Sequence, residues 1–170
     1  NMESTYHKDF VAGLKNTVMF VALNVPVSIL VPLGFALLLH IKAKGSKVFQ
    51  SVYYLPTLFS ISAVGIMWMQ MLNKRFGLVS IFGIKKALTI TNPWMWIMLI
   101  IMSVWWTMGT NMVIYQAALG GVSKDLYESA ALDGASGFQK IRYIALPSIR
   151  FQLLYTLVIT VAGSFNVYGQ

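Results

Sequence analysis

Charged side chains are scarce in this sequence of 170 residues. Only 11% of the residues are charged, and only five are acidic. A soluble domain usually carries about 25% charged residues, because it must present a polar surface to water. Since 57% of the chain is hydrophobic, the composition argues against a soluble globular domain and indicates a membrane protein.

Cysteine is absent, and histidine occurs only as His7 and His40. The first absence excludes disulfides and thiolate chemistry. The wide separation of the two histidines gives no metal-ligand spacing, so we expect no metal site. The net charge is +8, but the basic residues lie in small groups beside apolar runs and form no continuous stripe. This arrangement is typical of membrane proteins and does not predict a nucleic-acid partner.

Four apolar segments dominate what is present, at about residues 17–39, 52–72, 94–119 and 151–168. The first would be about 34 Å long as a helix, enough to cross a bilayer. We therefore predict an all-α, polytopic membrane helical bundle, with residues 1–170 forming one transmembrane domain. Pro26 and Pro32 lie inside the first segment, where neighbouring helices can satisfy the carbonyls that proline leaves unpaired. Because residue 1 is Asn and the fourth segment reaches the last residues, we expect a piece of a longer chain.

The basic residues of the connections do not orient these four segments. Six lie on one side (Lys8, Lys15, Lys74, Arg75, Lys85, Lys86) and seven on the other (Lys42, Lys44, Lys47, Lys124, Lys140, Arg142, Arg150). The positive-inside rule therefore leaves the orientation open.

The longest polar stretch, residues 123–147, is called the elbow below. Ser123 is suited to cap a helix that carries Asp125 and Glu128 in its first turns and that stops at Gly134. Ser136 and Gln139 then form a capping-box pattern that predicts a second short helix. The residue pattern alone leaves two alternatives open: an ordinary connector at the membrane interface, or a docking site for a soluble partner.

The elbow also contains a longer motif: Glu, two small residues, three residues, Gly, nine residues, Ile, any residue and Leu-Pro. It resembles the signature of inner-membrane permease subunits of binding-protein-dependent ABC importers, with Ser129 at a position where that family usually has Ala. The matching residues are Glu128, Ser129, Ala130, Gly134, Ile144, Leu146 and Pro147, with Asp133 and Ala135 fitting a common variant. The stretches LKNT, FQSVYYLP, FGLVSIFG and GSFNVYGQ resemble the carbohydrate-uptake (maltose and multiple-sugar) branch.

The resemblance implies a type I importer permease fold in the cell (plasma or inner) membrane, with four spans of a six-span core and a cytoplasmic 120–150 loop. It implies that the elbow docks on ATPase subunits and that Ala130 and Ala131 allow close approach. Glu128 would make a polar or charge-assisted contact, either with the ATPase or within the elbow. Gly134 would set the backbone geometry. A solvated acid in the first turns is the alternative for Glu128. The implied partners are ATPase subunits, a second and different permease chain, an extracellular solute-binding protein and a sugar.

The chain has no G-x-x-x-x-G-K-[ST] phosphate loop, so we expect no enzymatic activity and no cofactor of its own. ATP and Mg²⁺ would be bound by the partner ATPases.

Neutral polar residues gather on two of the apolar segments. Ser103, Thr107 and Thr110 share one helical face, bordered by Asn111 and near Trp105 and Trp106, while Thr160 and Ser164 are four residues apart. We expect these faces to line a path for an uncharged sugar; bonding to their own backbone or packing against another helix is the alternative. No Asp, Glu, Lys, Arg or His lies inside the four segments, which argues against an ion-coupled secondary transporter or channel. A membrane scaffold is a third possibility.

Overall fold

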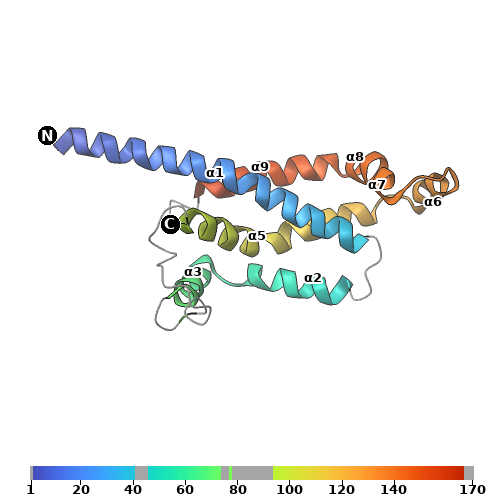
Figure 1. The fold of residues 1–170 in the computed structure, drawn as a ribbon, viewed down its shortest axis with the longest axis horizontal. Coiled ribbons are helices and arrows are strands. Elements are labelled where there is room, and N and C mark those ends of the chain that lie inside the picture. The colour runs from blue at the N-terminus through green and yellow to red at the C-terminus, as the bar shows by residue number, and fades with distance from the viewer. Residues whose placement is uncertain (1, 41–45, 74–76, 78–93, 167–170) are drawn as a thin grey trace.

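The computed structural model describes residues 2–40, 46–73, 77 and 94–166, and every regular element in these ranges is a helix (Figure 1). The elements are α1 (Met2–His40), α2 (Ser46–Tyr54), the 3₁₀ helix η1 (Leu55–Leu58), α3 (Ile61–Met71), α5 (Trp94–Gly120), α6 (Lys124–Leu132), α7 (Gly137–Lys140), the π-helix η2 (Ile141–Ala145), α8 (Leu146–Ser148) and α9 (Arg150–Asn166). The all-α prediction is confirmed over the described ranges.

Helix α1 is longer than the apolar segment 17–39 that predicted it. It begins at Met2 and runs to His40 without interruption, although Pro26 and Pro32 lie inside it. Its N-terminal turns project beyond the other helices (Figure 1). The apolar pattern therefore located the packed part of the helix and missed the polar turns before it.

The second predicted segment, 52–72, is not one straight helix. The helical runs Val48–Leu58 and Ile61–Met71 meet at an angle of 100°. Phe59 has extended backbone angles (φ −84°, ψ 146°), and the Ser60 hydroxyl caps α3 by accepting from the Ala63 N–H. We call Phe59 and Ser60 the corner. As a membrane-spanning unit, this segment is a bent pair.

The third and fourth segments match α5 and α9 closely. Tyr6–His40 and Trp94–Gly120 are each long and apolar enough to cross a membrane. If each bent pair counts as one span, the described residues hold up to four spans. In the second bent pair, Gly137–Ser148 meets Arg150–Phe165 at 66°. The predicted end of segment four at 167–168 and most of the 74–93 connection, including nearly all of FGLVSIFG, lie outside the described residues.

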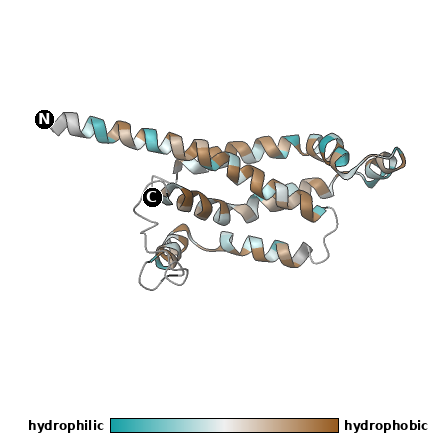
Figure 2. Cartoon of the chain, viewed as in Figure 1, coloured by the Kyte–Doolittle hydropathy of each residue, from teal (hydrophilic) through white to brown (hydrophobic). Residues whose placement is uncertain are grey.

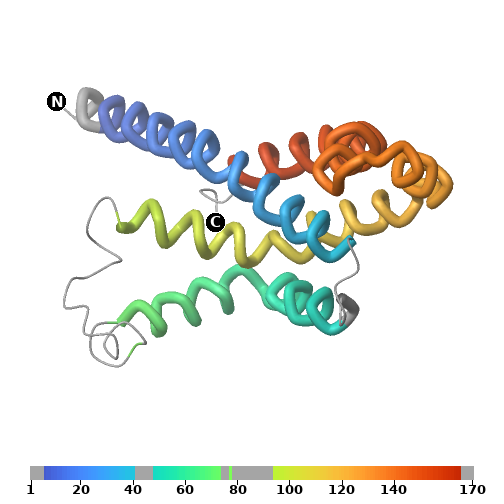
Figure 3. The backbone as a smooth tube through the Cα atoms, turned by 45° about the vertical axis from the view of Figure 1, so that its right-hand side comes forward, coloured from blue at the N-terminus to red at the C-terminus, as the bar shows by residue number. Residues whose placement is uncertain are grey.

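Helices α1, α5 and α9 pack together as the centre of the bundle, and α2 and η1 pack along α5 (Figures 1 and 3). At the end nearest the elbow, the buried core consists of Leu33, Ala36, Met112, Tyr115, Leu119, Ala145 and Ile149. The Phe35 ring, on α1, adds a contact with the Tyr53 ring, on α2, at 5.2 Å between centroids.

The outer faces of the helices remain apolar, as the hydropathy colouring in Figure 2 shows. Exposed side chains on these faces include Leu30, Leu38, Ile66, Leu154 and Val158. A single soluble chain would not leave so much apolar surface in water. These faces are suited to lipid or to neighbouring subunits in a membrane.

At Gly109, α5 lies directly against the backbone of the α2–η1 segment. A Cβ atom built there would lie 2.6 Å from the Tyr53 carbonyl oxygen and 2.7 Å from the Tyr54 Cα. Both of these atoms belong to the backbone, so neither can move away by a rotamer change. Only glycine permits this distance between the two segments.

We therefore expect Gly109→Ala to separate α5 from α2 and to lower the free energy of unfolding by about 1 kcal/mol or more. Denaturant titration in detergent micelles measures this change. Gly34→Ala is the control, because a Cβ at Gly34 would meet no atom within 4 Å. Equal unfolding free energies for Gly109→Ala and Gly34→Ala would contradict the close packing of α5 against α2.

Candidate functional site

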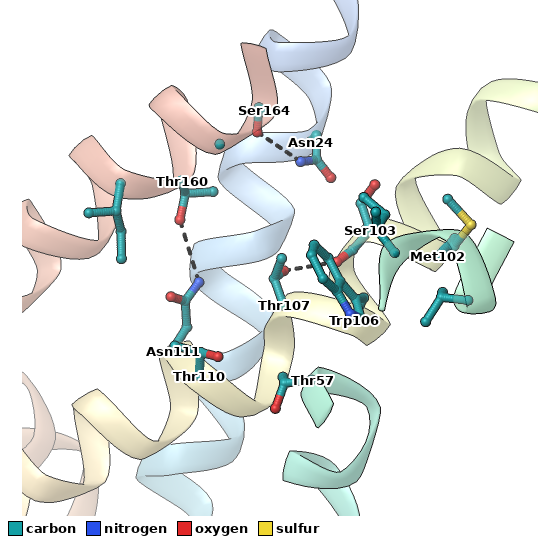
Figure 4. Close-up of a pocket in the computed structure, with 14 residues that line it drawn as sticks. Asn24, Thr57, Met102, Ser103, Trp106, Thr107, Thr110, Asn111, Thr160 and Ser164 are labelled. Atoms are coloured by element: carbon teal, nitrogen blue, oxygen red, sulfur yellow. Dashed lines mark hydrogen bonds between the residues drawn. The ribbon is translucent and has the colours of Figure 1, made fainter. Parts of the chain in front are cut away.

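A cavity of about 250 Å³ lies among α1, η1, α3, α5 and α9, and we call it the central cavity (Figure 4). All six residues predicted for the substrate path line it: Ser103, Thr107, Thr110, Asn111, Thr160 and Ser164. The other lining residues are Asn24, Thr57, Ile61, Val64, Met102, Trp106, Ile159 and Gly163. The volume is a little below the range of about 300 to 1,000 Å³ for small-molecule pockets.

The Asn111 side chain replaces a hydrogen bond that α1 cannot make. In a regular helix the Ser28 carbonyl would accept from the N–H of residue 32, but residue 32 is proline and has no N–H. The Asn111 amide nitrogen, on α5, donates to this carbonyl at 3.0 Å. Asn111 is only 3% exposed, so the interior of the bundle satisfies the carbonyl that Pro32 leaves unpaired.

Further hydrogen bonds around the cavity join α1, α5 and α9. The Asn24 amide, on α1, donates to the Ser164 hydroxyl, on α9, at 3.1 Å, and the Ser28 hydroxyl donates to Asn24 Oδ1 at 3.3 Å. The Asn111 amide also lies 3.5 Å from the Thr160 hydroxyl, as the dashed lines in Figure 4 show. Buried polar groups thus fix the relative positions of α1, α5 and α9.

A second polar contact between α5 and α9 lies closer to the elbow. The Tyr115 and Thr156 hydroxyls are 2.6 Å apart, and Thr156 donates to carbonyls of its own helix. Tyr115 is therefore the donor of the pair. Both side chains are fully buried, so this bond stabilises the bundle and does not line the cavity.

The three residues predicted to share a face of α5 differ in their surroundings. Ser103 is buried, Thr107 is half-buried and Thr110 is exposed. The Thr107 hydroxyl donates to the Ser103 carbonyl at 2.9 Å, which is the backbone bonding that the sequence left open as an alternative. Both interpretations therefore hold for Thr107, since it bonds its own helix and also lines the cavity.

Trp106 lies at the cavity wall and also contacts the corner. Its indole N–H donates to the Phe59 carbonyl at 3.1 Å. Its neighbour Trp105 does not line the cavity; its ring meets the Trp68 ring, on α3, edge to face at 6.1 Å. Two consecutive tryptophans of α5 thus hold the corner and α3 in place.

None of the described residues around the central cavity is ionisable. Its polar groups are hydroxyls and amides, and its apolar surface comes from Trp106, Met102 and aliphatic side chains. In the described part of the chain, no group of three or more His, Cys, Asp or Glu side chains is arranged to hold a metal ion. The cavity is chemically suited to an uncharged polar ligand with hydroxyl groups.

The first half of the elbow folds as its residues predict. The Ser123 hydroxyl accepts from the Asp125 N–H at 3.2 Å and caps α6. At the other end, the Ala135 N–H donates to the Ala130 carbonyl at 2.8 Å and the Gly134 N–H to the Ala131 carbonyl at 3.1 Å. This pair of bonds is a Schellman motif, and Gly134 has the left-handed φ of +76° that it requires.

The second half of the elbow begins with the predicted capping box. The Ser136 hydroxyl accepts from the Gln139 N–H, and Gln139 Oε1 accepts from the Ser136 N–H at 2.7 Å. The helix then widens into η2, and α9 begins only at Arg150. Pro147 therefore lies in the first positions of the short helix α8, before α9 begins. Ile144 and Leu146 are half-buried, while Pro147 is exposed.

A second cavity, of about 730 Å³, lies between the elbow and the ends of α1 and α5. Glu128 lines it together with Tyr127 and His40, whose rings are 5.6 Å apart. The Tyr127 hydroxyl is buried without a hydrogen-bond partner among the described residues, and burial raises the pKa of this hydroxyl. Glu128 is exposed but lies on the side of α6 that faces this cavity.

The remaining elbow residues form a surface that no other described residue covers. Helix α6 has no buried residue, and Ser129, Ala131, Asp133 and Gly134 are exposed, while Ala130 and Ala135 are half-buried. Leu132 is 90% exposed and Phe138 is 73% exposed. These two apolar side chains, on either side of Gly134, were not among the predicted contact residues.

The sequence profile of the binding-protein-dependent transport system inner membrane component family matches residues 2–168. The chain belongs to this family. It is therefore a multi-pass component of the inner membrane, and the family is non-catalytic. Membership argues against the ion-coupled carrier, channel and scaffold alternatives.

Two relatives are sugar-transport permeases by name. The arabinooligosaccharides transport system permease protein AraP of Halalkalibacterium halodurans is 30% identical over all of this chain and 56% of that protein. The lactose transport system permease protein LacF of Rhizobium radiobacter is 27% identical over 95% of this chain and 56% of that protein. The chain thus spans about half the length of the curated relatives it matches.

The fold also matches a solved transporter. A chain of a bacterial ABC transporter involved in the import of the acidic polysaccharide alginate superposes with a TM-score of 0.83 and 27% identity, covering 93% of this chain and 58% of that one. The same kind of transporter in complex with an alginate pentasaccharide-bound periplasmic protein gives a TM-score of 0.77 over 90% of this chain and 56% of that one. The importer permease fold is confirmed over the described residues.

The sequence pattern did not predict that Thr57 lines the central cavity or that Ser28 bonds to Asn24 and Asn111. The signal for Ser28 was available, because Pro32 four residues later frees its carbonyl. The position of Thr57 in the wall depends on the corner, which no periodic pattern in the sequence marked.

Proposed function

We propose that this chain is the permease subunit of an ATP-driven importer and that its central cavity forms part of the path for an uncharged sugar or oligosaccharide. The observation that supports this most directly is that six neutral polar residues from α5 and α9 gather around one cavity with Trp106 in its wall. Hydroxyls and amides pair with sugar hydroxyl groups, and an aromatic ring stacks on the apolar face of a sugar. The names of AraP and LacF agree with this ligand class.

We further propose that the elbow is the coupling element that docks on a separate ATPase subunit in the cytosol. Three features of the elbow support this proposal: the Schellman turn, the two capped short helices, and the exposed apolar side chains Leu132 and Phe138. The proposed contact residues are those of the motif: Glu128, Ser129, Ala130, Ala131, Asp133, Gly134, Ala135, Ile144, Leu146 and Pro147. The complete importer would contain ATPase subunits, a second permease chain and an extracellular solute-binding protein.

Uptake by the reconstituted importer is expected to discriminate strongly by substrate charge. In vesicles loaded with ATP, neutral oligosaccharides should enter with a kcat/KM at least about 100-fold above that of uronate oligomers of the same length. The reason is that a carboxylate in a cavity without cations loses its hydration and gains no partner, at a cost of several kcal/mol. Radiolabelled uptake measures both rates.

Vesicles without ATP serve as the control, and they should accumulate neither class. Equal uptake of neutral and acidic oligosaccharides would contradict the neutral-sugar assignment. Uptake driven by an ion gradient in the absence of ATP would contradict the importer assignment itself.

A further inference from the structure

We propose that Trp106 is a positioning residue whose indole N–H sets the angle of the corner and links that angle to the occupancy of the central cavity. This inference rests on the proposed function, because it takes a sugar as the occupant. It goes further because it gives one hydrogen bond of the bundle a role: this bond passes the effect of sugar binding from the central cavity to the corner.

The corner is where the backbone leaves helical geometry and where its polar groups need other partners. Phe59 and Ser60 are both extended. In a continuous helix the Phe59 carbonyl would accept from the Ala63 N–H, but that N–H donates to the Ser60 hydroxyl at 3.3 Å. The Trp106 indole, from α5, donates to the Phe59 carbonyl instead. A group on another helix therefore completes the hydrogen bonding of the bend.

The neighbouring contacts fix α5 against both arms of the corner. On the arm before the bend, Gly109 allows α5 to touch the backbone of Tyr53 and Tyr54. On the arm after the bend, the ring of Trp105 meets that of Trp68. The Trp106 bond lies between these two contacts, at the break between the two arms.

The same corner forms part of the wall of the central cavity. Thr57 lines the cavity from the arm before the bend (Figure 4), and Ile61 and Val64 line it from the arm after the bend. Trp106 lines the cavity as well. A ligand that stacks on the indole ring restricts the ring, and a restricted ring keeps its N–H aimed at the Phe59 carbonyl. Occupancy then narrows the range of corner angles.

The test uses Trp106→Phe, which keeps an aromatic ring in the wall and removes the N–H donor. Because the chain has no cysteine, cysteines introduced at the exposed positions Val52 and Met69 take spin labels selectively within this chain. The distance between the labels reports the corner angle in the assembled, reconstituted importer. Trp105→Phe is the matched control, since it removes an indole N–H from the adjacent residue.

In the wild type, a transported neutral sugar is expected to narrow the distribution of label distances. In Trp106→Phe the distribution should be broader without sugar and should not respond to it. The maximal rate of sugar-stimulated ATP hydrolysis should fall by about five- to tenfold with KM changed less than about twofold, because the ring contact remains. Trp105→Phe should respond to sugar as the wild type does.

An unchanged distribution in Trp106→Phe would overturn the role of the indole N–H in the corner. A broadened distribution in that variant, combined with no effect of transported sugar on the wild type, would overturn the link to occupancy. A broadened distribution in an importer that takes up no neutral sugar would support the corner contact and would reject the proposed function instead.

Discussion

Replacing Gly134 with proline is expected to lower sugar uptake at least tenfold while the membrane-embedded bundle stays folded. Gly134 has φ +76°, whereas the proline ring fixes φ near −65°. Proline would also remove the N–H that donates to the Ala131 carbonyl at 3.1 Å. The Schellman turn cannot form in this variant, so α6 and α7 lose their fixed mutual orientation. A coupling element without a fixed shape cannot transmit displacement from an ATPase subunit.

The bundle should tolerate this change because the turn does not contribute to its core. Gly134 is exposed and α6 buries no residue, while the core near the elbow is built from α1, α5, Ala145 and Ile149. The expected phenotype is therefore an assembled importer with normal thermal stability and at least a tenfold loss of ATP-dependent uptake. Uptake and ATP hydrolysis measured on the same vesicles separate uncoupling from misfolding.

Two milder variants calibrate this result. Gly134→Ala should reduce uptake partially, because a Cβ in the left-handed region costs about 1 to 2 kcal/mol. Gly137→Ala is the matched control three residues away: Gly137 begins α7, and a Cβ there would meet no atom within 4 Å. Full uptake by Gly134→Pro, or an equal loss in Gly137→Ala, would refute the coupling role of the turn.

The elbow was predictable because each of its signals is local. A cap, a left-handed glycine and a capping box act on residues within three to five positions, so Ser123, Gly134 and Ser136 indicated the helix ends correctly. The widening at Ile141–Ala145 and the short helix α8 between it and α9 were not predicted. They depend on how Ala145 and Ile149 enter the core beside α1 and α5, which is a tertiary effect.

The cavity was predictable only in part, for a related reason. Helical spacing places Ser103, Thr107 and Thr110 on one face of α5, and it cannot say what that face meets. The 100° corner brings Thr57 and Val64 into the cavity wall, and α5 contacts this bent segment through Gly109 and Trp106. A contact made from another helix leaves no periodic signal in the bent segment itself.

Replacing Asn111 with leucine is expected to lower the free energy of unfolding of the bundle by about 2 kcal/mol. Leucine is similar in size but has no donor, so the buried Ser28 carbonyl loses the bond of 3.0 Å from the amide. Because residue 32 is proline, no N–H within α1 can take its place. The contact to the Thr160 hydroxyl is lost as well. Unfolding titrations in micelles measure the change.

A double-mutant cycle with Pro32→Ala isolates the cause. Alanine at position 32 supplies the missing backbone N–H, so the Ser28 carbonyl regains a partner within α1. In that background, Asn111→Leu should cost about 1 kcal/mol less than in the wild type. Pro26→Ala is the control, because Pro26 frees the carbonyl of Ala22, which has no contact with Asn111 in the bonds described, and it should leave the cost of Asn111→Leu unchanged.

The cost of Asn111→Leu, compared between the wild type, Pro32→Ala and Pro26→Ala, decides between two roles for Asn111. If the asparagine served only as a sugar contact in the cavity, its replacement would raise KM and leave the unfolding free energy nearly constant in all three backgrounds. If it serves the Ser28 carbonyl, stability changes in the pattern described, and Pro32→Ala partly restores both stability and uptake. The same cost of Asn111→Leu with and without Pro32 would reject the carbonyl role. A proline inside a membrane helix and a polar residue on the facing helix then form one unit, since each is tolerated in the interior because of the other.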